Sequence, residues 1–279
     1  PFPHRSFTNK IFWFTLNTLT NGVARFWPNP TQYEPVVERV RVPVADLPAA
    51  LRGLTIAHLS DFHAGPHVHA ETIRHAAQMT MALKPDLIAL TGDFVHRQVE
   101  YATDCADALS ILRAPLGVHV VLGNHDYWRD HLTVERELRR VGLKPMHNTS
   151  HRLTRNGTAL YVVGVDDVRF RRADLARALR EVPADAPTIL LVHEPDFADF
   201  AHDAHSMVQL SGHSHGGQIR VPCLGALLLP SWGRKYPMGL RRTPRGAWVY
   251  TTRGIGVAMP PVRLNCPPEI SLLTLEVGS

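Results

Sequence analysis

The stretch LTIAHLSDFH, residues 54–63, carries an apolar run that is followed by an aspartate and a histidine two positions apart. The length and composition of the run are typical of a buried strand. Asp61 and His63 therefore stand where that strand should end. Taken alone, such a pair is more often a turn with a hydrogen-bonded carboxylate than a metal site. We expect a metal site only if other strand ends carry matching side chains.

The composition is that of an ordinary globular protein. The chain has 279 residues, of which 44% are hydrophobic and 20% charged, enough for one large domain or two small ones. The formal net charge of +5 favours an anionic partner such as phosphate, nucleic acid or an acidic membrane surface. Because no recognition helix or basic stripe with interleaved aromatics is found, nucleic acid is not the expected partner. The three cysteines form no C-x-x-C pair, which argues against a disulfide framework or a zinc ribbon.

Residues 1–50 are predicted to form an amphipathic N-terminal extension. In IFWFTLNTLTNGVARFWPNP, residues 11–30, apolar side chains recur at helical spacing. Polar residues interrupt the segment too often for a membrane span, which needs about 20 mostly apolar residues, and no signal-peptide cleavage site follows. Its aromatic and basic residues favour a position on a membrane surface, and packing against the domain remains the alternative. Because the sequence begins with proline, we also keep open a segment upstream of it.

From residue 51 to 279 the pattern predicts one mixed α/β domain. Apolar strand patterns at 54–61, 86–93 and 117–126 alternate with helical patterns at 69–84, 103–112 and 133–142. The pair Asn156-Gly157 between two further strand patterns is a strong hairpin signal. Later strands, such as 248–252 and 269–277, have no long helices between them. We therefore expect crossover units first and antiparallel pairs later.

Polar side chains follow five apolar runs, namely the three strand patterns above and the runs TILLV at 188–192 and MVQL at 207–210. These side chains are Asp61, His63, Asp93, Asn124, His125, Asp126, His193, His213 and His215. The carboxyl ends of parallel strands converge on one crevice of an open α/β sheet, so residues distant in sequence can be neighbours there. A dry cluster of histidines, aspartates and an asparagine would be costly unless a positive charge organised it.

The residue types in this set favour two divalent metal ions. Imidazole and carboxylate together suit manganese, iron or zinc, and the absence of cysteine disfavours a structural zinc site. Asp93 is the natural bridge, because one carboxylate can bind two ions that lie about 3.5 to 4 Å apart.

At this point the sequence resembles a known family. The blocks DFH, GD, GNHD, His193 and GHSH, in that order, are similar to the five-block signature of the calcineurin-like metallophosphoesterase superfamily, over roughly residues 53–277. The segments GHSHGGQIRVP, YPMGL and RGIGVAMPPVRLNCPPEISLLTL further resemble a bacterial branch of membrane-associated phosphodiesterases. The resemblance implies a four-layer α/β/β/α sandwich of two mixed β-sheets, with a dinuclear site at the strand ends.

The resemblance also implies a role for each site residue. One ion would bind Asp61, His63 and His215, the other would bind Asn124, His193 and His213, and Asp93 would bridge them. A hydroxide between the ions would attack phosphorus. His125 would stabilise the phosphoryl oxygens or protonate the leaving group, and Asp126 would hold the ring of His125 in position. His96 stands where the family leads us to expect an acidic residue.

These observations lead to one expected function and one alternative. We expect a metal-dependent phosphoesterase that hydrolyses a phosphodiester or a lipid-linked pyrophosphate, in a bacterium and peripheral to the membrane. The alternative is a catalytically silent scaffold of the same fold that binds a membrane or partners. The complete ligand set favours the enzyme, because a decayed member would be expected to lack ligands or the histidine of GNHD.

Overall fold

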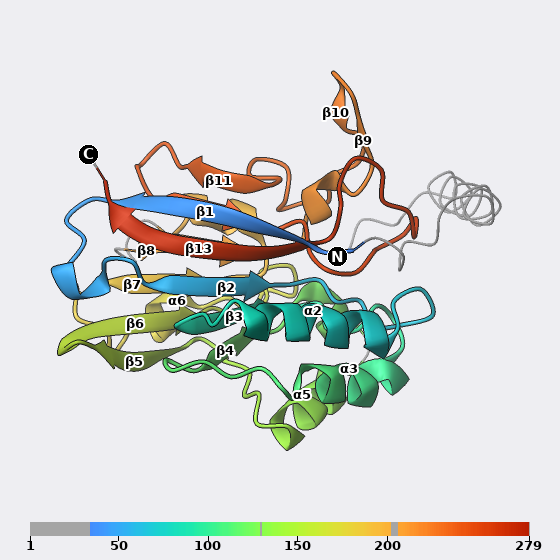
Figure 1. Ribbon diagram of the computed structural model, residues 1–279, viewed down its shortest axis with the longest axis horizontal. Coiled ribbons are helices and arrows are strands. Elements are labelled where there is room, and N and C mark those ends of the chain that lie inside the picture. Colours follow the sequence, from blue (N-terminus) through green and yellow to red (C-terminus); the bar gives the residue numbers. More distant parts are fainter. Residues whose placement is uncertain (1–33, 129, 202–205, 279) are drawn as a thin grey trace.

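The computed structural model describes residues 34–128, 130–201 and 206–278, and it contains two large β-sheets packed face to face (Figure 1). The first sheet has the spatial order β1 (Val36–Val44), β13 (Glu269–Val277), β2 (Thr55–Leu59), β3 (Leu87–Thr91) and β4 (Val118–Val121). Strand β13 runs antiparallel to β2, and the other neighbours are parallel. This sheet is therefore mixed, as predicted.

The second sheet is also mixed. Its spatial order is β11 (Gly239–Arg242), β12 (Trp248–Thr251), β8 (Ser206–Ser211), β7 (Thr188–Leu191), β6 (Thr158–Gly164) and β5 (Thr149–Arg155). The central strands are parallel, and the outermost strand at each edge is antiparallel to its neighbour. Asn156 and Gly157 join β5 to β6 with φ angles of 49° and 80°, so the predicted hairpin is confirmed.

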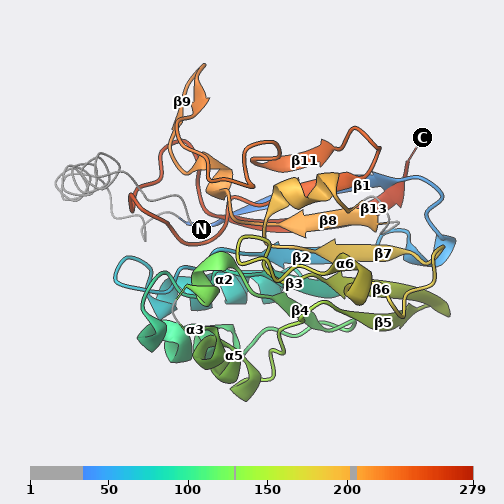
Figure 2. The same ribbon diagram turned by 180° about the vertical axis from the view of Figure 1, so that it is seen from behind.

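Helices cover the outer faces of both sheets, as Figures 1 and 2 show. On the first sheet these are α2 (Ala70–Ala82), α3 (Ala102–Leu109) and α5 (His131–Arg140), which bury their apolar faces against β2, β3 and β4. On the second sheet the layer is thinner and consists of α6 (Leu175–Ala178) and the 3-10 helix η4 (Pro195–Asp199). The inner faces of the two sheets share one apolar core, which confirms the expected four-layer sandwich.

Strand β1 extends the domain beyond the boundary expected at residue 51. Its nine residues pair in parallel with β13 from Val36 to Val44, and the side chains of Val42 and Val44 lie in the core between the sheets. The sequence signal is weak because most of the other β1 side chains are not buried. Residues 1–33, which carry the amphipathic segment, lie outside the described part of the chain. Within the described ranges, none of the helices combines the length and the apolar character that crossing a membrane requires.

The later strands are not all antiparallel, which corrects one expectation. Strand β12 pairs in parallel with β8, although only a loop, two short strands and β11 separate them in sequence. The reason is that the chain leaves the sheet after β8, makes a projecting hairpin of β9 (Arg220–Val221) and β10 (Gly225–Ala226), and re-enters at the sheet edge as β11.

Candidate metal centre

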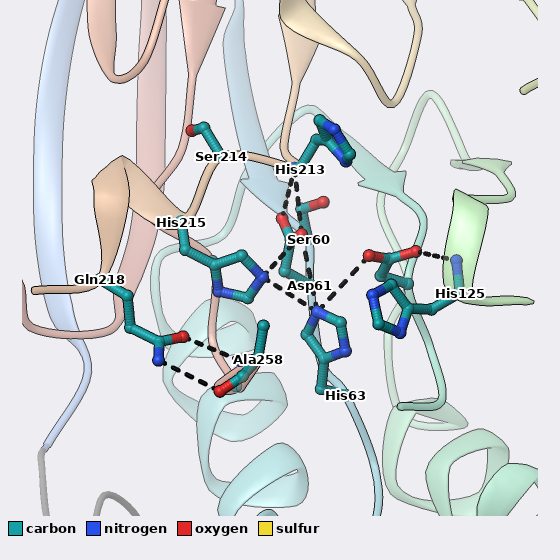
Figure 3. A network of polar contacts seen from close by, with 12 residues as sticks. Ser60, Asp61, His63, His125, His213, Ser214, His215, Gln218 and Ala258 are labelled. Atoms are coloured by element: carbon teal, nitrogen blue, oxygen red, sulfur yellow. Dashed lines mark hydrogen bonds and ion pairs between the residues drawn. The ribbon is translucent and has the colours of Figure 1, made fainter. Parts of the chain in front are cut away.

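The strand ends bring all seven predicted ligands to one end of the sandwich, and Figure 3 shows this region from close by. Three strands of the first sheet and two of the second supply them. Asp61 and His63 follow β2, Asp93 follows β3, Asn124 follows β4, His193 follows β7, and His213 and His215 follow β8. All seven are buried. The two sheets face each other, so the loops at their carboxyl ends meet across the shared core.

Asp61, His63 and His215 form a first group whose ligand atoms lie within 4.8 Å of one another. The Nε2 atoms of His63 and His215 are 2.9 Å apart. His215 Nε2 also lies 3.3 Å from Asp61 Oδ1. Two imidazole nitrogens and a carboxylate oxygen therefore converge on one point, which is the donor arrangement of a divalent metal site.

Asp93, His193 and His213 form a second group of the same kind. His193 Nε2 lies 3.3 Å from Asp93 Oδ2 and 3.3 Å from His213 Nδ1. Asp93 Oδ2 is also 3.4 Å from His63 Nε2 of the first group. One carboxylate oxygen thus faces both groups, which is the position that a bridging ligand requires.

One buried polar atom fits the same arrangement. Asn124 Oδ1 is buried and has no hydrogen-bond partner among the described residues. A buried polar group without a partner is costly, and about nine in ten or more find one. The Asn124 amide oxygen is a suitable donor to manganese or a similar ion, so the residues present fit bound metal.

Backbone carbonyls orient the imidazoles of the second group. His193 Nδ1 donates a hydrogen bond to the carbonyl of Thr91 at 2.6 Å, and His213 Nε2 donates to the carbonyl of Ser231 at 2.9 Å. Each bond directs the other ring nitrogen into the second group. Such outer contacts fix the tautomer of a metal-binding histidine. The sequence contains no signal for them, because any residue type can supply a carbonyl.

The backbone at the site is held in a sparsely populated conformation. Five of the seven residues have φ between 48° and 69°, namely Asp61, His63, Asp93, His213 and His215. Such angles are uncommon outside glycine and cost of the order of 1 to 3 kcal/mol each when the surrounding structure imposes them. Close approach adds a second constraint, because a Cβ on Gly212 would lie 2.2 Å from Asp61 Oδ2. Local strain of this kind is concentrated at functional sites.

Burial and charge set the protonation of these histidines. Burial lowers the pKa of His63 well below its usual value and that of His213 to about 3, so both rings are neutral, as metal ligands must be. Burial also lowers the pKa of His193, but the adjacent Asp93 carboxylate outweighs this effect and raises it well above its usual value. Asp93 therefore attracts a positive charge to His193 Nε2, and a divalent cation would supply one.

Asp126 does not hold the ring of His125, which corrects the role that the family resemblance implies. Its Oδ1 accepts from the backbone amides of Phe94 and Val95 at 2.8 and 3.2 Å. Its Oδ2 accepts from the amides of Asp93 and Gly123, both at 2.9 Å. The carboxylate is fully enclosed by the loops that follow β3 and β4, so it shapes the backbone of the Asp93 loop.

The ring of His125 is held instead by a carbonyl of the preceding loop. His125 Nδ1 donates to the carbonyl of His96 at 2.6 Å, and the backbone amide of His125 donates to Asp93 Oδ1 at 2.8 Å. The His96 ring stacks on the ring of His125, and its Nδ1 lies 3.2 Å from His63 Nδ1. His96, at the position where an acidic residue was expected, thus contacts two residues of the predicted site.

Comparison with known proteins identifies a family and several relatives. Residues 54–217 match the family described as Calcineurin-like phosphoesterase. The chain is 31% identical to the uncharacterized metallophosphoesterase YkuE of Bacillus subtilis, over 82% of each protein. It is 31% identical to phosphodiesterase YaeI of Escherichia coli, over 79% of this chain and 81% of that protein. It is 29% identical to UDP-2,3-diacylglucosamine pyrophosphatase LpxG of Chlamydia muridarum, over 81% of this chain and 84% of that protein.

The family match covers more than half of the chain, and it includes all five sequence blocks in full. The two bacterial relatives at 31% identity align over about four fifths of the sequence, so the likeness extends beyond the site to the strands that carry it. The chain belongs to the calcineurin-like phosphoesterase family.

Proposed function

We propose that the protein hydrolyses a phosphodiester or a lipid-linked pyrophosphate with two divalent cations. Asp61, His63 and His215 would hold one ion, and Asn124, His193 and His213 the other. Asp93 would bridge them. The observation that carries the proposal is that Asp93 Oδ2 faces an imidazole of each group, at 3.4 Å from His63 Nε2 and 3.3 Å from His193 Nε2.

When bound, divalent ions of this kind polarise phosphoryl oxygens and lower the pKa of water to near neutrality. The protein's own contribution is to fix the donors before the substrate arrives. The amide of His125 holds Asp93 Oδ1, which leaves Oδ2 directed into the centre. The amide of His213 donates to both oxygens of Asp61, at 3.0 and 3.1 Å, and holds that carboxylate in the same way.

His125 is the residue that we propose for proton transfer. Because Nδ1 donates to the His96 carbonyl, Nε2 is the nitrogen that would hold a proton for the leaving-group oxygen. Burial lowers the pKa of His125 below its usual value, and Asp93 and the His96 carbonyl offset this only in part. The ring of Trp128 lies edge-on to His125 at 5.1 Å and is half exposed, so this side of His125 lies beside the protein surface.

The substrate class follows from the named relatives. One is called a phosphodiesterase, and another is called a pyrophosphatase of a diacylated sugar nucleotide. Both names describe cleavage of a phosphorus–oxygen bond in a phosphate that carries two substituents. We therefore propose a disubstituted phosphate as the substrate, in place of a terminal phosphate monoester.

The experiment combines metal analysis with hydrolysis. The chain loaded with manganese should bind two ions and hydrolyse bis-p-nitrophenyl phosphate, a chelator should abolish the activity, and manganese should restore it. Asp93→Asn should lose metal and slow turnover by several orders of magnitude, since two-metal catalysis depends on the shared ligand. Asp107→Asn, at a half-exposed carboxylate on α3, is the matched control.

One ion or none in fully active protein would overturn the two-metal proposal. Two bound ions without hydrolysis of any diester, pyrophosphate or monoester tested would favour the scaffold that binds partners.

A further inference from the structure

A hairpin of β9 and β10 projects from the sandwich at the end that carries the candidate metal centre (Figures 1 and 2). The two strands pair through Val221 with Gly225 and through Arg220 with Ala226. The amides of Leu224 and Leu227 donate to the carbonyls of Val221 and Ile219. The backbone of the hairpin is thus hydrogen-bonded within itself. Its first strand is also attached to the loop before β13, because the Arg220 amide donates to the Leu264 carbonyl and Asn265 Nδ2 donates to the Arg220 carbonyl.

The hairpin and the residues that follow it expose three large apolar side chains. Leu224 is 75% exposed, Leu227 56% and Leu228 51%. Nowhere else along residues 34–128, 130–201 and 206–278 do three large apolar residues lie exposed within five positions. Single exposed leucines are normal on a protein surface, but a contiguous apolar projection marks a site of interaction.

Both ends of this segment are attached to the candidate metal centre. At the first, the Arg220 guanidinium donates to the carbonyl of Gly216, next to His215, at 2.9 Å. At the second, the carbonyl of Ser231 accepts the hydrogen bond from His213 Nε2. Whatever the leucines contact is therefore held at a fixed position relative to the metal centre.

The surroundings of the projection are basic. Arg220 and Asn265 line a shallow hollow beside β9. Arg234 and Lys235 are exposed a few residues after the leucines, and Lys235 is paired with Asp199 at 2.6 Å. Exposed leucines flanked by arginine and lysine are complementary to a bilayer that carries anionic headgroups, because each basic group near such a surface is attracted to it.

We infer that the β9–β10 hairpin docks the protein on an anionic membrane by inserting Leu224, Leu227 and Leu228 among the lipid chains. A lipid surface suits this feature better than a protein partner. A stable protein interface needs about 800 Å² and 20 to 30 residues on each side. Three leucines on a narrow projection offer far less, whereas insertion into lipid requires no complementary shape.

Docking in this way would bring the metal centre to the depth of lipid headgroups. This consequence rests on the proposed function, since it presents a lipid-linked phosphate to the site. The docking itself does not rest on the proposed function, because it requires neither metal nor hydrolysis. A failure of the docking inference can therefore be told from a failure of the proposed function.

The native cysteines allow a direct test on the full chain. Cys223 is exposed within the hairpin, and the other two cysteines are buried. A bimane label on Cys223 should shift its emission to shorter wavelength when vesicles with phosphatidylglycerol are added. It should also become protected from iodide and quenched by lipids that carry a nitroxide in their chains. Vesicles of phosphatidylcholine alone should give a smaller response at low salt.

A matched control places the label elsewhere on the same protein. In Cys223→Ser with Leu132→Cys, the label lies on α5, which is far from the hairpin in both views, at a leucine that is 66% exposed. This label should not respond to vesicles.

In a second experiment, the triple variant L224S/L227S/L228S should bind anionic vesicles at least roughly tenfold more weakly than the wild type, since each leucine buries apolar area in lipid. Leu132→Ser should bind as the wild type does.

Three outcomes would overturn the inference. An unchanged Cys223 label on protein that sediments with vesicles would assign membrane contact to another segment. Protein that stays in the supernatant at low salt would exclude an anionic bilayer as the partner. A label response to protein concentration without vesicles would assign the leucines to a contact between copies of the chain.

Discussion

His63 and His215 lie with their Nε2 atoms 2.9 Å apart, although 152 residues separate them in sequence. Two imidazole nitrogens at this distance either share one proton or share a cation. Asp61 Oδ1 lies 3.3 Å from the His215 nitrogen and 3.9 Å from the His63 nitrogen, which favours a positive charge between them. The relationship joins a loop of the first sheet to a loop of the second, so metal bound here should also stabilise the packing of the sandwich.

We expect His125→Ala to separate proton transfer from metal binding. The variant should keep its metal content, because His125 lies outside both ligand groups. It should lose about 10² to 10⁴ more rate on an alkyl diester than on bis-p-nitrophenyl phosphate, whose leaving group needs no proton. His69→Ala, at an exposed histidine, is the control. Equal losses on the two substrates would assign His125 to charge stabilisation, and loss of metal would contradict both roles.

Asp126→Asn should weaken metal binding and stability together. The carboxylate accepts hydrogen bonds from four backbone amides. The NH2 group of an asparagine would face some of these amides, and it cannot accept a hydrogen bond from them. Unfolding in urea should show a loss of about 2 to 4 kcal/mol in the free energy of unfolding. Manganese affinity should fall by about 10- to 100-fold, as when an outer contact of a metal ligand is lost. If metal affinity and stability were unchanged and only the alkyl diester rate fell, Asp126 would act through the His125 ring after all.

Arg263→Lys should destabilise the loop behind Asp61. The guanidinium is fully buried and donates to the carbonyls of Arg253, Gly254, Gly256 and Cys266. The same loop donates from its Gly256 amide to the carbonyl of Asp61 at 2.7 Å. Lysine has three donors on one atom and cannot reach all of these groups, so we expect a loss of about 2 to 4 kcal/mol. Urea unfolding measures it, with the exposed Arg241→Lys as control. A loss equal to that of the control would show that the loop is held without Arg263.

His147→Asn should cost more stability in acid than in base. The hydrogen bond with Asp166 raises the pKa of His147, and burial offsets this rise only in part. Glu135 lies 3.1 Å from the other ring nitrogen of His147 and adds to the rise. The pKa of His147 is higher in the folded state than in the unfolded state. The stabilisation is therefore complete at pH values below the unfolded-state pKa, and it is lost as the pH rises through the folded-state pKa. The side chain is 29% exposed, so we expect about 1 kcal/mol at pH 5.5 and less at pH 9. Unfolding at the two pH values checks this, and a cost that grew with pH would contradict it.

The position of the candidate site residues at neighbouring strand ends could be predicted because each follows an apolar run. A buried strand precedes each of Asp61, Asp93 and His193. Burial requires that strand to be a run of apolar residues, and this run is visible in the sequence. The short-range hairpin at Asn156-Gly157 is equally local, since both residues tolerate the positive φ that its turn requires. In such cases the physical cause lies within about ten residues of the feature, so the sequence by itself determined it.

The tertiary structure alone decided the roles that depend on backbone contacts and exposure. The His96 carbonyl holds the His125 ring, and Asp126 accepts amides from the loops after β3 and β4, but carbonyls and amides belong to every residue type and leave no sequence signal. The run LGALLL is apolar whether it packs in a core or projects into solvent. Only the paired strands β9 and β10 place Leu224 outside the core, because the long-range packing of the sandwich leaves that hairpin without a neighbouring layer to cover it.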